Sequence, residues 1–173
     1  MKKMLIGLVT VSILGLYSCD KPPAACNSGY TGTNCATQIT PTQIQVTKIS
    51  ITNFPSTNPS SGNDWNLTES SGHADIYPTL SDSAGNTIYT FSSVYLTNAS
   101  NQNVNTFTPG SPIILSSPLS AYSLTLYNHN NATADDNMGS ATQVLYNPYG
   151  GFPSTITLSG SGVTFVLSVQ YVW

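Results

Sequence analysis

Apolar and polar residues alternate through most of this chain, and this period of two constrains the fold more than any other feature of the sequence. The longest example is the C-terminal stretch, where one face carries Val163, Phe165, Leu167, Val169, Tyr171 and Trp173. Residues two apart lie on the same face of a β-strand, so we expect this face to line a hydrophobic core. Beyond the first 18 residues, apolar residues do not recur at helical spacing. The chain is therefore predicted to be all-β.

Eight stretches of this kind are separated by turns rich in Asn, Gly, Pro and Ser. They are residues 44–54, 74–81, 87–96, 111–115, 121–128, 140–147, 154–158 and 163–173. Short strands with such turns favour an antiparallel β-sandwich or a small barrel. In the first stretch the apolar positions change parity, which predicts a β-bulge near Lys48. Pro78 lacks a backbone N–H, which predicts that the second strand lies near an edge or a bend.

The N-terminus is typical of a secretory signal. Lys2 and Lys3 precede an apolar run that is too short for a permanent membrane span. The run ends in Leu-Tyr-Ser-Cys, which resembles the signal of bacterial lipoproteins. This resemblance implies cleavage before Cys19 and acylation of Cys19. We therefore expect a signal peptide over residues 1–18, a lipidated tether over 19–43 and one folded domain over 44–173.

The composition excludes nucleic acid as a partner. The chain has four lysines, no arginine and seven acidic residues, and its formal net charge is −3. Nucleic-acid binding needs clusters of Lys and Arg that neutralise phosphates. Only 6% of the residues are charged, so the polar surface must be built from Ser, Thr, Asn and Gln.

The chain contains three cysteines. If Cys19 carries the lipid, Cys26 and Cys35 are the pair that remains in an oxidising compartment, which predicts a disulfide. The spacing Cys-x₈-Cys around Gly-Tyr-Thr-Gly resembles the final loop of an epidermal-growth-factor-like domain. We expect this closed loop to stiffen the tether.

Most acidic residues of the domain lie in two segments, residues 63–77 and 126–140. They are Asp64, Glu69, Asp75, Asp135 and Asp136. Clustered carboxylates repel one another unless a cation is bound, and Ca²⁺ prefers oxygen ligands. The two segments therefore predict a cation site.

The same two segments resemble the C-two (C2) domain, the eight-stranded β-sandwich of calcium-dependent lipid-binding proteins. SGHADIYPTL is similar to its Ser-Asp-Pro-Tyr segment, and LYNHNNATADDNMG is similar to its Asp-x-Asp-x₅-Asp-x-x-Gly loop. With Gly139 as the loop's glycine, Asp136, Asn130 and Asn128 take its three acidic positions. Asp75 takes the place of the first loop's aspartate.

An earlier ligand in the first loop is supplied by Asn66, Asp64 or Glu69. The calcium site implied by the resemblance therefore consists of Asn66, Asp75, Asn128, Asn130 and Asp136. Asn128 and Asn130 keep a carbonyl oxygen but lose the charge of an aspartate. We expect either a degenerate site that is structural or empty, or weak binding with a Kd of about 1 mM. At about 10 mM Ca²⁺ such a site stabilises the fold by about 1.4 kcal/mol.

No catalytic motif of the form G-x-S-x-G or H-E-x-x-H occurs. A glycosidase pair drawn from Glu69, Asp75 and Asp136 is an alternative that the sequence leaves open. His73 and His129 lie in the acidic loops and are expected to be exposed rather than metal-binding. We therefore predict that the protein is not an enzyme.

The overall layout resembles lipoproteins of Bacteroidetes-type bacteria, and Asp82-Ser83-Ala84 resembles their O-glycosylation site, with Ser83 as acceptor. The resemblance implies a lipid-anchored binding or assembly protein of the outer membrane, an accessory subunit of a membrane protein complex. Which face of the outer membrane it occupies stays open. The alternative is a weak calcium-dependent module that binds lipid or glycan.

Overall fold

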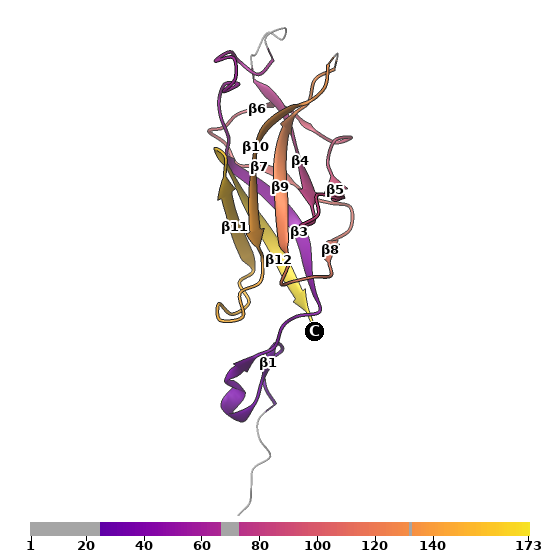
Figure 1. Cartoon of the computed structure of the whole chain (residues 1–173), viewed down its shortest axis with the longest axis vertical. Helices are drawn as coiled ribbons and strands as arrows, with labels where there is room; N and C mark the ends of the chain where they lie inside the picture. Colours follow the sequence, from indigo (N-terminus) through magenta and orange to yellow (C-terminus); the bar gives the residue numbers. More distant parts are fainter. Residues whose placement is uncertain (1–24, 67–72, 132) are drawn as a thin grey trace, which may run out of the picture.

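The computed structural model of the protein describes residues 25–66, 73–131 and 133–173. Two antiparallel β-sheets pack face to face, and a small hairpin lies at one end (Figure 1). The predicted antiparallel β-sandwich is therefore confirmed. Cys19 and Glu69 lie outside the described residues. No helix in the described residues is long and apolar enough to cross a membrane.

The N-terminal hairpin consists of β1 (Tyr30–Thr31) and β2 (Thr37–Gln38), joined by the 3₁₀ turn η1 (Thr33–Cys35). The first sheet holds β4 (Ala74–Ser81), β5 (Thr87–Thr90), β6 (Leu96–Ala99), β9 (Ala121–Asn128) and β10 (Asp136–Val144). The second sheet holds β3 (Gln43–Asn53), β7 (Asn105–Phe107), β8 (Ile113–Leu115), β11 (Thr155–Gly160) and β12 (Val163–Val172).

The first sheet has the order β10-β9-β4, and both β5 and β6 pair with the other side of β4. The second has the order β11-β12-β3, and both β7 and β8 pair with the other side of β3. All eight predicted strands are present, but residues 87–96 contribute to two strands and β7 was not predicted. The short polar sequences of β6 (LTNA) and β7 (NTF) carry no apolar alternation, so the sequence pattern does not reveal them.

The predicted disulfide is also confirmed, because Cys26 and Cys35 are bonded at an Sγ–Sγ distance of 2.15 Å. The bond closes the N-terminal hairpin segment around β1 and η1. It joins two ends of a segment that has little hydrophobic core of its own.

The core lies between the two sheets, and most of the predicted face of β12 lines it. The buried residues of that face are Val163, Phe165, Leu167 and Val169. The expectation that Trp173 belongs to the core is wrong, because its side chain is 43% exposed. Trp173 follows the last paired residue of β12, and its ring lies edge-on to Phe152 with the centroids 5.0 Å apart.

The predicted bulge in β3 is confirmed. Lys48 pairs with Ser168 and Val46 pairs with Val169, which leaves Thr47 as an extra residue. The extra residue changes the parity of the strand, so apolar side chains on both sides of the bulge face the core.

Pro78 lies in β4, a central strand, so the prediction of an edge position is wrong. Its carbonyl oxygen accepts a hydrogen bond from the backbone N–H of Phe91, at 3.1 Å. Phe91 lies between β5 and β6, so the neighbouring strand is interrupted opposite Pro78. A proline is accommodated here because its missing N–H would face that break.

Gly139 marks the closest approach of β10 to the turn before β12. Its φ is +144°, and a Cβ atom there would lie 2.4 Å from the carbonyl oxygen of Ser161. Gly85, in the turn after β4, also has a positive φ (+86°), but a Cβ atom there would meet nothing within 4 Å.

We expect Gly139→Ala to lower the melting temperature clearly more than Gly85→Ala. Both substitutions impose a backbone conformation that costs about 1–3 kcal/mol for a residue other than glycine. Only Gly139→Ala adds a clash with a backbone oxygen that has little room to move. Thermal unfolding followed by circular dichroism measures both shifts, and equal shifts would contradict the close approach.

Candidate functional site at the loop end

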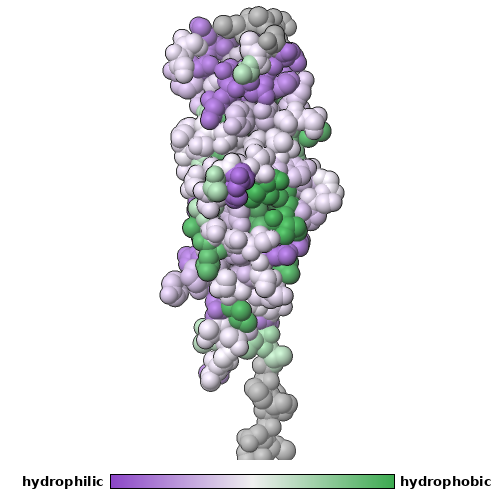
Figure 2. Space-filling view, turned by 45° about the vertical axis from the view of Figure 1, so that its right-hand side comes forward, coloured by the Kyte–Doolittle hydropathy of each residue, from purple (hydrophilic) through white to green (hydrophobic). Residues whose placement is uncertain are grey.

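The loops gather at two opposite ends of the sandwich. One end, which we call the loop end, is formed by residues 54–66, 97–104 and 128–136 and lies at the top of Figure 1. The N-terminal hairpin lies at the other end. The described part of both acidic segments reaches the loop end, and this end of the surface is mostly hydrophilic (Figure 2).

Asn128 is the centre of a hydrogen-bond network at the loop end. Its side chain is completely buried. The Oδ1 atom accepts a hydrogen bond from the backbone N–H of Asp75, at 2.9 Å. The Nδ2 group donates to Oδ1 of Asn66 and to Oδ1 of Asn130, each at 3.1 Å. One amide therefore links the loops that precede β4 and β10.

The other two predicted ligands extend this network. Oδ2 of Asp136 accepts a hydrogen bond from Nδ2 of Asn130, at 3.1 Å. Asp75 is buried, and its Oδ1 accepts the backbone N–H of Asn98 at 2.8 Å. The structure thus brings together Asn66, Asp75, Asn128, Asn130 and Asp136, the five residues of the predicted calcium site.

Asp135 and Tyr77 complete the network. The sequence analysis counted Asp135 among the clustered carboxylates but not among the five ligands, and it assigned no role to Tyr77. The hydroxyl of Tyr77 donates to Oδ2 of Asp135 at 2.5 Å, and the backbone N–H of Asn130 donates to Oδ1 at 2.8 Å. Burial opposes the charge on Asp135, but these two hydrogen bonds and the nearby His129 outweigh it and lower the pKa of Asp135. Burial, followed by the bond to Asp135, raises the pKa of Tyr77 well above its usual value.

The sequence did contain a signal for Tyr77. It follows Asp75 by two residues on β4 and therefore lies on the same face of the strand. His129 differs from the expectation of an exposed loop residue, because its ring lies 4.1 Å from that of Tyr95 and Nδ1 lies 3.2 Å from Oδ1 of Asp135. That contact lacks hydrogen-bond geometry, so it is a close electrostatic approach. His73 is exposed, as expected.

The network does not fit a calcium ion. Calcium is held by six to eight oxygen atoms, whereas Oδ1 of Asn66 and Oδ1 of Asn130 converge on the Nδ2 group of Asn128. That amide cannot turn round, because its nitrogen would then face the N–H of Asp75. Among the described residues, no group of three or more His, Cys, Asp or Glu side chains could hold a metal. The Nδ2 group of Asn128 therefore takes the two side-chain oxygens, of Asn66 and Asn130, that a cation would need as ligands.

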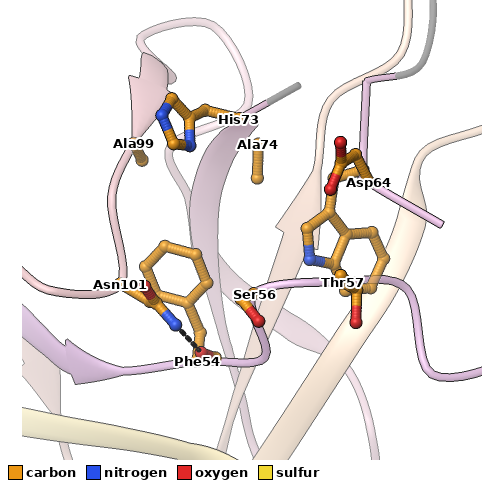
Figure 3. Close-up of a pocket in the computed structure, with 9 residues that line it drawn as sticks. Phe54, Ser56, Thr57, Asp64, His73, Ala74, Ala99 and Asn101 are labelled. Carbon is orange, nitrogen blue, oxygen red and sulfur yellow. Dashed lines mark hydrogen bonds between the residues drawn. The ribbon is translucent and has the colours of Figure 1, made fainter. Parts of the chain in front are cut away.

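A cavity of about 310 Å³ opens at the loop end (Figure 3). It adjoins the network, because its lining residues Trp65 and Ala74 directly precede Asn66 and Asp75. It is lined by Phe54, Ser56, Thr57, Asp64, Trp65, His73, Ala74, Ala99 and Asn101. The two aromatic and two alanine side chains are buried, while Asp64 and His73 are exposed at the rim. Hydrogen bonds hold the wall in place, since Nε1 of Trp65 donates to the carbonyl of Pro55 and Nδ2 of Asn101 donates to that of Phe54.

Ser83, the predicted glycosylation site, is exposed in the turn between β4 and β5. Asp82 shapes this turn by accepting hydrogen bonds from the backbone N–H groups of Ala84 and Asn86. The turn leaves room for a glycan, and glycosylation of Ser83 stays a prediction.

We expect Asn128→Asp to convert the network into a calcium site. Without Ca²⁺ the variant should melt below the wild type, because a buried carboxylate would face the oxygens of Asn66 and Asn130. Adding about 10 mM CaCl₂ should raise its melting temperature by a few degrees and leave the wild type unchanged. Asn131→Asp adds the same charge to an exposed position of the same loop and should show no shift. A calcium-dependent shift in the wild type would contradict our interpretation of the network.

We expect Tyr77→Phe to raise the pKa of Asp135, because the substitution removes a hydrogen bond to the ionised carboxylate. A lowered pKa in the folded state adds stability above the unfolded value of about 3.9, and this stability is lost as the pH falls below it. The wild type should therefore lose its advantage over Tyr77→Phe below about pH 4. Tyr127→Phe, in the ring stacked on Tyr77, is the control. Carboxyl NMR titration measures the pKa, and an unchanged value in Tyr77→Phe would refute the assignment.

Comparison with known proteins defines the fold. No protein-family model matches the chain, and no curated protein matches it. Among solved structures, one described as a C2 domain is similar, with 12% identity and a TM-score of 0.50, over 76% of this chain and 98% of that one. A human cytosolic phospholipase A2 is also similar, with 16% identity and a TM-score of 0.50, over 75% of this chain. This chain spans 17% of the length of that phospholipase. The sandwich therefore has a C2-like fold, as the resemblance of its loops predicts.

Proposed function

We propose that the protein is a non-catalytic module, anchored by a lipid on Cys19, that binds a carbohydrate at its loop end without calcium. The cavity beside the Asn128 network is the observation that carries this proposal. The C2-like fold supports a binding role, since its loops are joined to a rigid sandwich, and the cavity lies where four residues of the core, Phe54, Trp65, Ala74 and Ala99, reach the loop end.

The chemistry of the cavity suits a sugar. Phe54 and Trp65, which are 3% and 6% exposed, form an apolar floor of the cavity, and the exposed edges of their rings can contact the C–H groups of a sugar. The carboxylate of Asp64, the amide of Asn101 and the hydroxyl of Thr57 can hydrogen-bond sugar hydroxyl groups. Pockets that bind small ligands combine an apolar lining with a few polar groups in this way.

The charge of the loop end disfavours an anionic ligand. Lys48 is the only Lys or Arg of residues 44–173, and it lies in β3 outside the cavity lining. Asp64 lies on the rim, and Asp135 and Asp136 lie in the adjacent network. Phosphate headgroups would meet negative charge with no cation to bridge them, because the network is closed by the Asn128 amide. A neutral polar ligand meets no such repulsion.

The proposal is tested with the full-length protein and a panel of neutral oligosaccharides, namely fragments of glucans, mannans, galactans and xylans, by isothermal titration calorimetry. We expect the protein to bind at least one class of oligosaccharide, with an affinity that a calcium chelator does not change. Asp64→Ala should weaken it about tenfold or more, because hydrogen bonds to charged groups contribute about 1.5–3 kcal/mol. Thr157→Ala, an exposed change on β11, is the matched control.

Two outcomes would overturn the proposal. Binding to phosphatidylserine vesicles only when Ca²⁺ is present would favour the calcium-dependent lipid module instead. Binding to none of the oligosaccharides, with or without Ca²⁺, would favour the assembly role in an outer-membrane complex.

A further inference from the structure

The N-terminal segment, residues 25–41, is docked on the end of the sandwich opposite the loop end, and we call this end the base (Figure 1). Gly29 is buried there, and a Cβ atom on it would lie 2.4 Å from the ring of Phe152 and 2.6 Å from that of Trp173. The ring of Tyr30 meets Phe152 edge-on, with the centroids 5.4 Å apart. The segment is therefore packed against the sandwich and is not a loose spacer.

Hydrogen bonds of Gln38 reinforce this packing. Its Nε2 group donates to the hydroxyl of Tyr146 and to the carbonyl of Asn147, each at 3.0 Å. Its Oε1 accepts the backbone N–H of Gly151 at 3.0 Å. The hydroxyl of Tyr146 in turn donates to the carbonyl of Ile39, at 3.2 Å. One side chain of the N-terminal segment thus binds both arms of the loop between β10 and β11.

The base also carries large apolar side chains that are exposed to solvent. Tyr149 is 95% exposed, Trp173 is 43% exposed and Ile39 is 40% exposed. All three belong to the docked segment, the adjoining loop or the C-terminus. Trp and Tyr are enriched at membrane–water interfaces, where their rings lie at the level of the headgroups.

We infer that the base is the surface by which the sandwich contacts the membrane that holds its lipid, and that the loop-end cavity faces away from that membrane. The inference rests on the lipid anchor of the proposed function. Only five residues separate Cys19 from Ala25, where the described chain begins. Six Cα–Cα steps span at most about 20 Å, so the anchor keeps the base close to the bilayer.

The loop end lies much farther from the anchor. β3, of 11 residues, runs from the base toward the loop end, and a strand of this length spans about 35 Å. Because the N-terminal segment is packed on the base, the body does not bend between Ala25 and the cavity. The carbohydrate must therefore come from the aqueous side and cannot be a headgroup of the anchoring membrane.

The two tryptophans of the chain test this orientation, because Trp173 lies at the base and Trp65 lines the loop-end cavity. The full-length protein is reconstituted in phosphatidylcholine vesicles that contain a dansyl-headgroup lipid. We expect tryptophan-to-dansyl energy transfer in the wild type. Trp173→Phe should abolish it, and Trp65→Phe should retain it. Transfer that persists in Trp173→Phe would overturn the inference, even if Trp65→Phe failed to fold.

Two glycines of the hairpin segment provide a matched pair for the docking. Gly29 and Gly32 have similar positive φ values, +88° and +82°, but a Cβ atom on Gly32 would meet only Thr37 of the same segment. Both are introduced into the Trp173→Phe protein. Gly29→Ala should release the N-terminal segment from the base, so that the sandwich can turn and Trp65 can transfer energy to the membrane. Gly32→Ala should leave the segment docked and give no transfer. If neither double variant showed energy transfer, docking of the N-terminal segment would not be what sets the orientation.

The Cys19→Ala protein separates failure of the anchor from failure of the orientation. We expect it to give no energy transfer and no label from a fatty-acid probe, in contrast to the wild type. Equal fatty-acid labelling of the two proteins would overturn the anchor, and with it this inference. A labelled wild type in which Trp65 rather than Trp173 transfers energy would overturn the orientation alone.

Discussion

The hydrogen bond from the backbone N–H of Asp75 to Oδ1 of Asn128 sets the direction of the amide at the centre of the loop end. With the oxygen held on one side, the –NH₂ group must point to the other, where Asn66 and Asn130 offer oxygens. A buried amide without partners would cost about 1–3 kcal/mol, and here the Asn128 amide is paired on both sides. The loops are therefore joined by neutral hydrogen bonds, whereas clustered carboxylates at these positions would need a cation.

The two ends of the sandwich differ in chemistry and lie at opposite ends of its long axis, so the molecule is polar along that axis. The loop end is hydrophilic (Figure 2) and acidic, and it is hollowed beside the network, whereas the base combines the exposed rings of Tyr149 and Trp173 with the docked N-terminal segment (Figure 1). The burial of Gly29 against Phe152 and Trp173 makes the segment part of the folded body. The sandwich between them is a rigid spacer, since its strands share one core.

Sequence reasoning found the five residues of the network at the loop end, but neither the bonds among them nor the cavity beside them. The resemblance to the C2 loop, aligned on Gly139, selected Asn128, Asn130 and Asp136, and the structure brings these residues together. The sequence did not reveal that the Asn128 nitrogen faces the oxygens, because the choice depends on Asp75, 53 residues away along the chain. Tyr77 was overlooked for a related reason. An alternating strand pattern shows which face a side chain takes, but not which carboxylate it meets there.

Local pattern alone determined the all-β class, the position of eight strands and the bulge in β3, because period and parity depend only on neighbouring residues. The sequence also predicted the Cys26–Cys35 pair, which the structure contains. Tertiary structure decided what depends on distant segments. Pro78 lies in a central strand, opposite a break between β5 and β6. Trp173 lies exposed at the base, although its place in the alternating pattern predicts a core position. These outcomes depend on packing between residues far apart in the chain, which no local period encodes.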